Sequence, residues 1–392
     1  MTAAAGTIRL PRPDGSSVEV KLSSPAGHPH MAARATSRRV YAAVHVVADP
    51  WSVSADAEGA IDWDATLAVR TRMWRLGLGV AEGMDTAQRG GGLGWADART
   101  LIDRTLAASA EVGGDTVVGI TTDQLPPGPA TTSALVEAYL EQLSFVEERG
   151  GSAVVMASRQ LAAGASRPED YLAVYDAVLG AATRPVVLHW LGEMFDPALR
   201  GYWGTTDPGQ AADTVLDLLT RHAPRVAGIK MSLLDAAAER ALRARLPEGV
   251  RMFTGDDFHY VSLMAPDVQD GRHSDALLGA FAAVPRYAAA ALHRLDAGDV
   301  AGFRDILGPT QDLARLVFEA PTRFYKAGVV WLSYLDGQQP HFRMIGGLEA
   351  GRSLAHLMRV WEAANAIGYF DEPEAAARRL LDVLHGHGLV AA

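Results

Sequence analysis

Short apolar runs alternate with segments of helical period through most of this chain. Segments 95–112 and 132–150 carry apolar residues at helical spacing, and each lies between two of the runs. Alternating strands and helices are typical of parallel βαβ units, so the runs predict parallel strands. The runs occupy residues 41–48, 76–81, 116–121, 152–157, 185–191, 226–231 and 250–254.

The number of these units predicts the type of sheet. We expect an eighth strand within residues 274–281, followed by a helix from about Pro285 to Leu295. Seven or eight units fit a closed (β/α)8 TIM barrel better than an open sheet. A doubly wound open sheet is the alternative, but no G-x-G-x-x-G motif follows the first run. The predicted class is therefore α/β, with a TIM barrel.

The two ends of the sequence differ from the barrel pattern. Residues 1–39 contain the segments TIRL and VEVKL around an Asp14-Gly15 turn, which predicts a β-hairpin and a lead-in. The barrel is expected over residues 40–298. Residues 299–392 contain helical patterns without strand-like runs and without a low-complexity linker. This part is predicted to be a helical C-terminal extension packed on the barrel.

Composition removes several classes of function. A net charge of −10 argues against binding to nucleic acid, which requires a concentrated basic face. The chain has no cysteine, so disulfides, thiolate zinc sites and cysteine nucleophiles are excluded. No apolar stretch approaches the ~20 residues of a membrane helix, and no basic start precedes an apolar segment. We therefore expect a cytoplasmic enzyme that does not bind a membrane.

Polar residues follow the predicted strands at their carboxyl ends, where TIM-barrel enzymes place their working groups. Each of these residues also has a structural interpretation. Strand-end carboxylates such as Asp123 and Asp257 often cap the next helix, His189 is compatible with a hydrogen-bonded core position, and Arg159 is compatible with a simple ion pair. The candidates for the site are Glu82, Asp85, Asp123, Arg159, His189, Glu193, Lys230, Asp256, Asp257 and His259.

Lys230 stands out because the chain has only three lysines and many arginines. Burial at a strand end disfavours the charged form of lysine, which frees the amine to attack a carbonyl carbon. A buried lysine paired with an acid would give the same sequence signal. Of the other two lysines, Lys21 lies on the predicted hairpin, and Lys326 is assigned a packing role in the extension.

The segments around Lys230 resemble a known superfamily. GIKMS (228–232), followed by FTGDD (253–257), is similar to the dihydrodipicolinate synthase/N-acetylneuraminate lyase superfamily, in which a G-x-K strand carries a Schiff-base lysine. A fuller pattern resembles a branch described as a dihydrodipicolinate synthase-like domain of unknown function. The resemblance covers the chain from about residue 40 to its end. The segments that carry it are AEGMDTAQRG, HWLGEMFDP, GYWG, TGDDF and APTRFYKAGVV.

The resemblance implies roles for individual residues. Lys230 would form the iminium, and His189 would shuttle the proton, since it stands where the superfamily usually has a tyrosine and imidazole titrates near neutral pH. Arg159 would clamp a substrate carboxylate. Asp85, Asp256 and Glu193 would orient hydroxyls or the imidazole, and the remaining candidates would bind substrate. The loop after the second strand lacks the tandem hydroxyl residues that bind pyruvate in the superfamily, so pyruvate as substrate is not carried over.

These observations predict a class I (Schiff-base) aldolase, lyase or dehydratase that acts on an oxo acid or keto sugar derivative. We expect a small-molecule carbonyl substrate and neither a cofactor nor a metal; self-association into a homo-oligomer is implied by the resemblance. One alternative is a metal-dependent TIM-barrel lyase, isomerase or hydrolase, although no H-x-H or H-E-x-x-H spacing supports it. A sugar-sensing or scaffold protein is a third interpretation. The metal alternative would draw its ligands from His45, Glu82, Asp85, Asp123, His189, Glu193 and Asp256.

Overall fold

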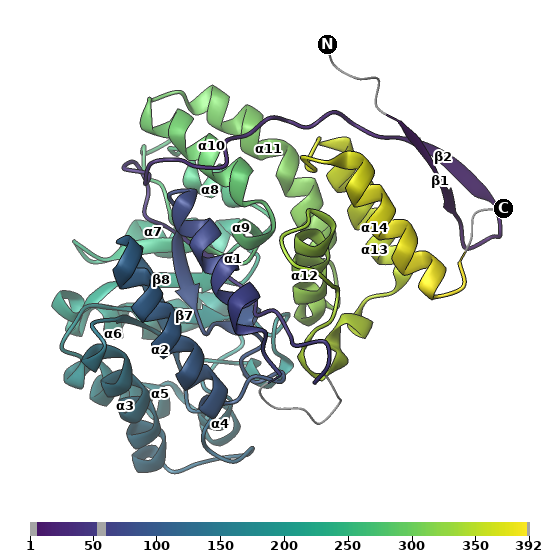
Figure 1. Cartoon of the computed structure of the whole chain (residues 1–392). Coiled ribbons are helices and arrows are strands. Elements are labelled where there is room, and N and C mark those ends of the chain that lie inside the picture. The colour runs from purple at the N-terminus through teal and green to yellow at the C-terminus, as the bar shows by residue number, and fades with distance from the viewer. Residues whose placement is uncertain (1–5, 53–59, 390–392) are drawn as a thin grey trace.

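Eight parallel strands close into a barrel in the computed structural model, which describes residues 6–52 and 60–389 (Figure 1). The last strand pairs with the first through Ala276 and Val40, so the sheet has no free edge and the open-sheet alternative is wrong. The expected eighth strand is confirmed. The barrel strands are β3 (Val40–Ala43), β4 (Gly79–Glu82), β5 (Thr116–Ile120), β6 (Ser152–Val155), β7 (Val186–Leu191), β8 (Val226–Ser232), β9 (Arg251–Thr254) and β10 (Asp275–Leu278).

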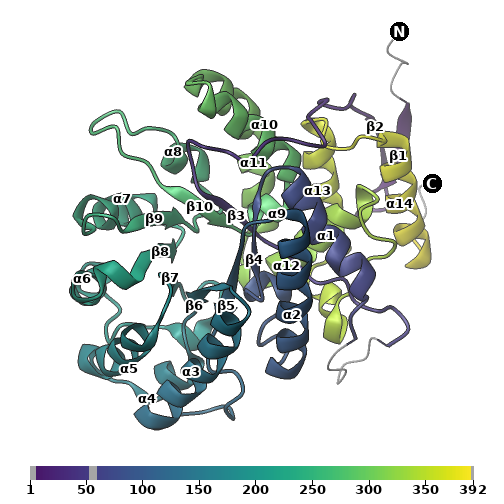
Figure 2. The ribbon, with the colours of Figure 1, turned by 60° about the vertical axis from the view of Figure 1, so that its left-hand side comes forward.

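Helices surround the strands on the outside of the barrel, as Figure 2 shows. The helix expected over residues 95–112 is confirmed as α2. Several helices begin at an acidic N-cap; Asp62, for example, accepts a hydrogen bond from the Ala65 backbone N–H and satisfies a donor of the first turn. The helices of this layer are α1 (Trp63–Arg75), α2 (Trp95–Val112), α3 (Thr132–Glu148), α4 (Arg159–Gly164), α5 (Pro168–Ala181), α6 (Pro208–Arg221), α7 (Ala236–Arg245), α8 (Tyr260–Met264), α9 (Ala280–Ala283) and α10 (Pro285–Asp296).

The first apolar run is longer than the strand that it forms. β3 ends at Ala43, whereas residues 44–48 are buried outside the sheet. The Val47 backbone N–H donates to Thr66 Oγ1 on α1 at 2.9 Å, so this segment finds its hydrogen bonds in the helical layer. The expected strand over 41–48 is therefore shorter, because burial alone does not require that a segment join a sheet.

Side chains pointing inward fill the lower part of the barrel. Tyr41, Val154, Val187, Phe253 and Leu277 belong to one buried apolar cluster. Each buried aliphatic or aromatic side chain contributes about 1.5–3 kcal/mol relative to an exposed one. Because this part is packed with side chains, a substrate has room only above the cluster, at the carboxyl ends of the strands.

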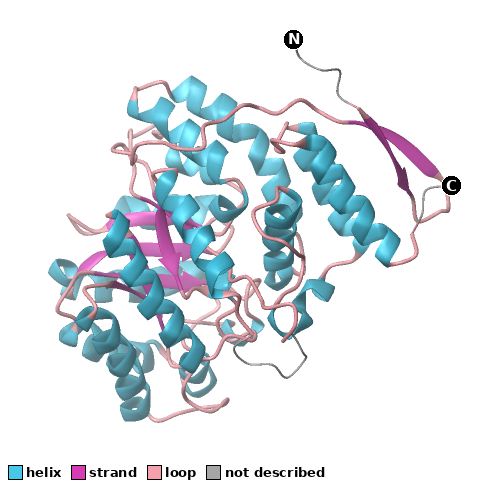
Figure 3. Cartoon of the chain, in the orientation of Figure 1, coloured by secondary structure: helices cyan, strands magenta, loops and turns pink. Residues whose placement is uncertain are grey.

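The N-terminal hairpin and the C-terminal helices are present as predicted. β1 (Thr7–Pro11) and β2 (Ser17–Lys21) form an antiparallel pair, which lies apart from the barrel and beside the last helices (Figure 3). Asn365 ties this hairpin down by donating to the Lys21 carbonyl at 3.0 Å. The helices of the extension are α11 (Val300–Val317), α12 (Tyr325–Leu335), α13 (Leu354–Ala366) and α14 (Pro373–Gly386).

The extension packs on the barrel through α12. Val329, Trp331 and Leu332 of this helix are buried in the same apolar cluster as residues of β3 and β10. Two short 3₁₀ segments, η4 (Thr322–Phe324) and η5 (Ile345–Gly351), flank α12 along the chain. None of the helices in the described part of the chain is long and apolar enough to cross a membrane.

Candidate active site

Lys230 points into the barrel near the carboxyl end of β8. It pairs in register with His189 of β7 and with Phe253 of β9, and Phe253 belongs to the inner cluster. Only 8% of Lys230 is exposed. Gly255 makes room for it, because a Cβ at that position would lie 2.9 Å from Lys230 Cε. The strand register therefore places this amine just above the apolar filling of the barrel.

Burial brings the pKa of the Lys230 amine toward the neutral range. Burial lowers the pKa of Lys230 from 10.5 to about 8, against the opposing effect of the Asp257 and Asp85 carboxylates. Burial likewise raises the pKa of Asp257 to about 7. Two smaller effects oppose this rise, namely a 2.8 Å hydrogen bond from the Ala280 N–H and the positive charge of Lys230. A lysine and an acid that both titrate near neutral pH form an arrangement suited to proton transfer.

His189 lies beside Lys230 as a buried imidazole. Its Nε2 atom is 3.2 Å from Ser232 Oγ, while its buried Nδ1 atom has no hydrogen-bond partner. Burial, and then the Lys230 charge, lower the pKa of His189 well below 6.5. The imidazole is therefore neutral at neutral pH. The sequence interpretation assumed an ordinary histidine pKa, and this assumption is wrong because desolvation disfavours the imidazolium.

Two adjacent cavities open at this end of the barrel. The larger, of about 500 Å³, is lined by His189, Asp123 and residues of the loops after β4 to β7, and we call it the barrel lobe. The smaller, of about 230 Å³, is closed by Arg323, Lys326 and other residues of the extension, and we call it the extension lobe. Both lobes share the wall residues Asp85, Arg89, Gly90, Arg159 and Asp196.

Lys230 and Asp257 lie behind the wall of these lobes. Neither residue lines either lobe, but His189 lines the barrel lobe and Asp85 lines both lobes. His189 is the register partner of Lys230 and the Asp85 charge acts on the Lys230 pKa, so two residues that line the lobes are neighbours of this amine in the fold or in its electrostatic surroundings. A carbonyl group that enters between them would meet Lys230.

Arginine–carboxylate pairs shape the wall of the barrel lobe. Arg89 donates two hydrogen bonds to Asp123, at 2.6 and 2.7 Å. Burial by itself would raise the pKa of Asp123, but the hydrogen bonds and charge of Arg89 outweigh it and lower the pKa below 3.8. Arg159 forms an ion pair with Asp196 and donates to the Gly90 carbonyl at 3.2 Å. Its side chain is 46% exposed, so Arg159 keeps donors that face the solvent and the cavity.

The extension contributes two residues that sequence reasoning did not place in the site. Lys326 Nζ forms a 2.9 Å ion pair with Asp85 Oδ2. The hydroxyl of Tyr325 is 2.7 Å from Thr86 Oγ1, and burial, followed by the Asp85 charge, raises the Tyr325 pKa well above 10. The prediction of a packing role for Lys326 did not anticipate this position, because α12 turns the side chain toward the barrel mouth, where it lines the extension lobe. The scarcity of lysine, which drew attention to Lys230, was the available signal for Lys326 too.

Glu82 is not brought to the cavity, although it ends β4. Its carboxylate accepts hydrogen bonds from Arg70 at 2.8 and 2.9 Å and from Thr105 at 2.6 Å, on helices α1 and α2. Both members of the ion pair are fully buried. Glu82 therefore faces the helical layer and joins it to the barrel.

Three other candidates lie away from the two lobes. Glu193 is 55% exposed and pairs with Arg200 at 3.5 Å. Asp256 accepts hydrogen bonds from the backbone N–H groups of Phe258 and His259, and its second oxygen lies 2.9 Å from His259 Nδ1. Asp256 thus stabilises the turn after β9, the capping role that sequence alone left open for strand-end carboxylates, while the neighbouring Asp257 lies beside Lys230.

The groups named for a metal centre do not converge. Within residues 6–52 and 60–389, no three or more histidine, aspartate or glutamate side chains are placed to hold a metal ion together. His45 Nε2 instead lies 2.8 Å from Gln339 Oε1, and Glu82 is bonded to Arg70. The donor set for the metal-dependent alternative is thus dispersed.

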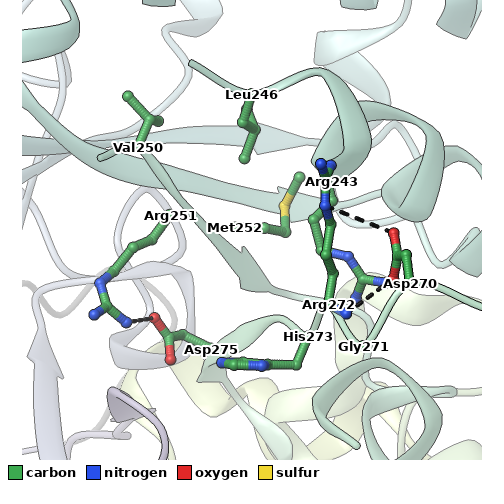
Figure 4. Close-up of a pocket in the computed structure, with 10 residues that line it drawn as sticks. All are labelled: Arg243, Leu246, Val250, Arg251, Met252, Asp270, Gly271, Arg272, His273 and Asp275. Atoms are coloured by element: carbon green, nitrogen blue, oxygen red, sulfur yellow. Dashed lines mark hydrogen bonds and ion pairs between the residues drawn. The ribbon is translucent and has the colours of Figure 1, made fainter. Parts of the chain in front are cut away.

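A third cavity, of about 420 Å³, lies at the opposite end of the barrel (Figure 4). Arg251 and Asp275, the first residues of β9 and β10, form a 2.6 Å ion pair there, and Arg272 pairs with Asp270 at 3.7 Å. Since the working groups of TIM barrels lie at the carboxyl ends of the strands, this cavity is not the candidate site.

Comparison with solved structures supports the fold. The structure resembles dihydrodipicolinate synthase from Aquifex aeolicus with 15% sequence identity and a TM-score of 0.58, over 90% of this chain and 98% of that chain. The enzyme from Acinetobacter baumannii, solved in complex with pyruvate, has 15% sequence identity and a TM-score of 0.61, and the match covers 86% of this chain and 100% of that chain. The enzyme from Cyanidioschyzon merolae, solved with lysine bound, has 14% sequence identity and a TM-score of 0.63, and the match covers 85% of this chain and 99% of that chain.

Comparison of the sequence with protein families gives a more direct assignment. No curated protein matches this chain significantly. A family model matches residues 8–389, which include the hairpin, the barrel and the extension. The chain therefore belongs to the family described as protein of unknown function (DUF993), and its fold is the TIM barrel of the dihydrodipicolinate synthases.

Proposed function

We propose that this protein is a class I lyase, of the aldolase or dehydratase kind, that binds an oxo acid or keto sugar derivative as an iminium on Lys230. The observation that carries the proposal is the pairing of a buried amine of pKa about 8 with a buried acid of pKa about 7. This pair lies at the carboxyl end of a TIM barrel, next to a cavity of about 500 Å³. The fold shared with dihydrodipicolinate synthases adds support.

The residues suggest how the iminium forms. The unprotonated Nζ atom of Lys230 attacks the carbonyl carbon, and a C–N bond forms as the π bond of the carbonyl breaks. A proton passes from that nitrogen to the oxygen, which gives a carbinolamine whose nitrogen lone pair can form the C=N bond when the hydroxyl leaves. Protonated Asp257 then gives its proton to that hydroxyl, which leaves as water. At neutral pH about half of the Asp257 carboxyls are protonated, since their pKa is about 7. Asp257 is thus the proton donor in this step. His189 is less suited to donate a proton, because burial keeps its imidazole neutral.

The iminium then acts as an electron sink for an adjacent bond. Electrons of a neighbouring C–C bond, or of a C–H bond next to a leaving hydroxyl, flow toward the positively charged nitrogen. His189 lines the barrel lobe and is the candidate to accept a proton released in that step, but its lowered pKa makes it a weak base. Arg159, half-exposed at the shared wall, would bind a carboxylate of the substrate. Self-association, a cytoplasmic location and the absence of a cofactor stay predictions.

Borohydride trapping tests the proposal. The protein is incubated with a panel of oxo acids and keto sugar derivatives, reduced, digested and mapped by mass spectrometry. Hydride transfer to the iminium carbon leaves a stable secondary amine, so we expect the substrate mass at Lys230. Lys230→Arg should abolish trapping, because arginine keeps the charge but has no titratable amine. Lys21→Arg, on the hairpin, is the matched control. Undiminished trapping in Lys230→Arg would exclude the mechanism.

A further inference from the structure

We propose that the extension lobe binds a second, anionic group of the substrate, remote from the carbonyl that Lys230 attacks, and that Arg323 and Lys326 determine this specificity. The substrate would then be a dicarboxylic oxo acid or a similarly charged derivative. This inference rests on the proposed function, but it concerns a different part of the cavity. The observation behind it is the distribution of charge on the walls of the two lobes.

The walls of the two lobes contain more cations than carboxylates. Arg89, Arg159, Arg323 and Lys326 carry positive charge, whereas Asp85, Asp123 and Asp196 carry negative charge. The excess is notable in a chain whose net charge is −10. Cavities lined by one sign of charge concentrate ligands of the opposite sign. The local surplus therefore favours an anionic ligand.

The surplus is located in the extension lobe. Arg89 pairs with Asp123, and Arg159 pairs with Asp196, so the barrel-lobe cations are partnered. Arg323, by contrast, makes no ion pair with any residue that the structure describes; its guanidinium lies over the Phe324 ring at 4.8 Å. Its side chain belongs to an exposed residue and retains donors for a ligand.

Lys326 is only partly compensated by Asp85. The residue is 8% exposed, and its Nζ atom has one carboxylate partner, Asp85, and a 3.3 Å hydrogen bond to the Arg323 carbonyl. The same Asp85 carboxylate also raises the pKa of Lys230. The single carboxylate of Asp85 thus interacts with both Lys326 and Lys230. Because a buried cation is costly unless it is well paired, a ligand carboxylate beside Lys326 would be bound favourably.

The cavity at the opposite end of the barrel shows the contrasting arrangement. There Arg251 and Arg272 each have a carboxylate partner, Asp275 and Asp270, which also line that cavity (Figure 4). Arg243, the third arginine of that wall, pairs at 3.3 Å with Asp267, so each arginine of that wall has a carboxylate partner. The extension lobe differs from that cavity because Arg323 in its wall has no carboxylate partner among the residues that the structure describes.

The remaining wall of the extension lobe is apolar. Its side chains suit a hydrocarbon spacer between the carbonyl end and the distal anionic group, because the burial of methylene groups against apolar surface is favourable. The apolar residues of this wall are Phe195, Phe324, Met344 and Leu348.

The test compares pairs of oxo acids in the borohydride assay. Dicarboxylic oxo acids from oxaloacetate to oxoadipate are each measured against the monocarboxylic oxo acid of equal chain length. We expect at least one dicarboxylate to trap on Lys230 at about tenfold lower half-saturating concentration than its partner, as a charge-assisted contact implies. Lys326→Met should reduce that ratio to about one, and Arg323→Met should reduce it in part. Lys326→Arg should preserve it, and Lys21→Met is the matched control.

The outcomes separate this inference from the proposed function. If dicarboxylates and monocarboxylates trap equally on Lys230, and Lys326→Met changes nothing, the inference is wrong while the Schiff-base function stands. If no oxo acid is trapped, the proposed Schiff-base function is wrong. Calorimetry with adipate, which has no carbonyl group to attack, then tests the anion site by itself. Adipate that binds the unmodified protein and not Lys326→Met would still support the anion site. Adipate that binds neither would overturn it.

Discussion

Replacing Asp257 by asparagine should make Lys230 a stronger nucleophile at neutral pH. In the native site Lys230 has a pKa of about 8, and Asp257 is the main charge that raises it. At neutral pH about 10% of the Lys230 amines are then unprotonated, against about 0.03% for an ordinary lysine, a difference of about 300-fold. Asp257→Asn removes the carboxylate that stabilises the ammonium form. The Lys230 pKa should therefore fall by about one unit or more.

Trace acetylation with acetic anhydride measures this effect without a substrate. The reagent reacts with free amines, so the extent of labelling of each lysine against pH follows its deprotonation. Because the chain has only three lysines, peptide mapping reports Lys21 as an internal reference in the same sample. We expect the Lys230 midpoint near pH 8 in the native protein and below it in Asp257→Asn. In the same variant, trapping of a carbonyl compound should slow, because the proton donor for the departing water is lost.

The reasoning fails on either of two results. A Lys230 midpoint near that of Lys21 would show that burial does not depress its pKa, which removes the basis for a free amine. A midpoint that stays the same or rises in Asp257→Asn would show that the Asp257 charge does not raise the Lys230 pKa. Asp85→Asn should lower the midpoint as well, by a smaller amount, since Asp85 is the weaker of the two charges.

Further predictions concern the support of the site. Gly255→Ala should slow trapping at Lys230 about 10–100-fold, because its methyl group would lie 2.9 Å from Lys230 Cε; Gly180→Ala, with open space around it on α5, should leave trapping unchanged. Glu82→Ala should lower the free energy of unfolding in urea by about 3–5 kcal/mol, since it leaves Arg70 buried and unpaired. The protein that remains folded should still trap the substrate on Lys230. Reduced trapping at unchanged stability would instead place Glu82 in the substrate site. Chelators should leave trapping unaffected, and a chelator-sensitive reaction would favour the metal-dependent alternative.

The barrel and the position of Lys230 could be predicted from the sequence. Alternating apolar runs and helical periods are local features, and parallel strands joined by helices have few ways to bury both faces of a sheet. The rule that strand ends meet at one mouth then grouped Asp85, Asp123, Arg159 and His189 around one opening, where the structure has them line the barrel lobe. These inferences need only the order of elements along the chain.

The direction of individual side chains could not be predicted. Asp256 and Asp257 are adjacent, yet the first is bonded to the turn after β9 and the second lies beside Lys230. Both residues lie beyond the end of β9, where the chain turns, so no strand period fixes the directions of their side chains. Glu82 ends β4 and points to Arg70. The packing of neighbouring segments decides such cases, and no single segment contains it.

The contribution of Lys326 depends on tertiary structure entirely. This residue follows β8 by a long stretch of chain, and it reaches Asp85 only because α12 packs across the barrel mouth. The depressed pKa values of Lys230 and His189 have the same origin, since burial is a property of the assembled protein. The sequence by itself determined which fold forms and which lysine ends a barrel strand. Only the packing of distant segments decided which charges share one cavity, because electrostatic interaction depends on distance in space and on exclusion of water.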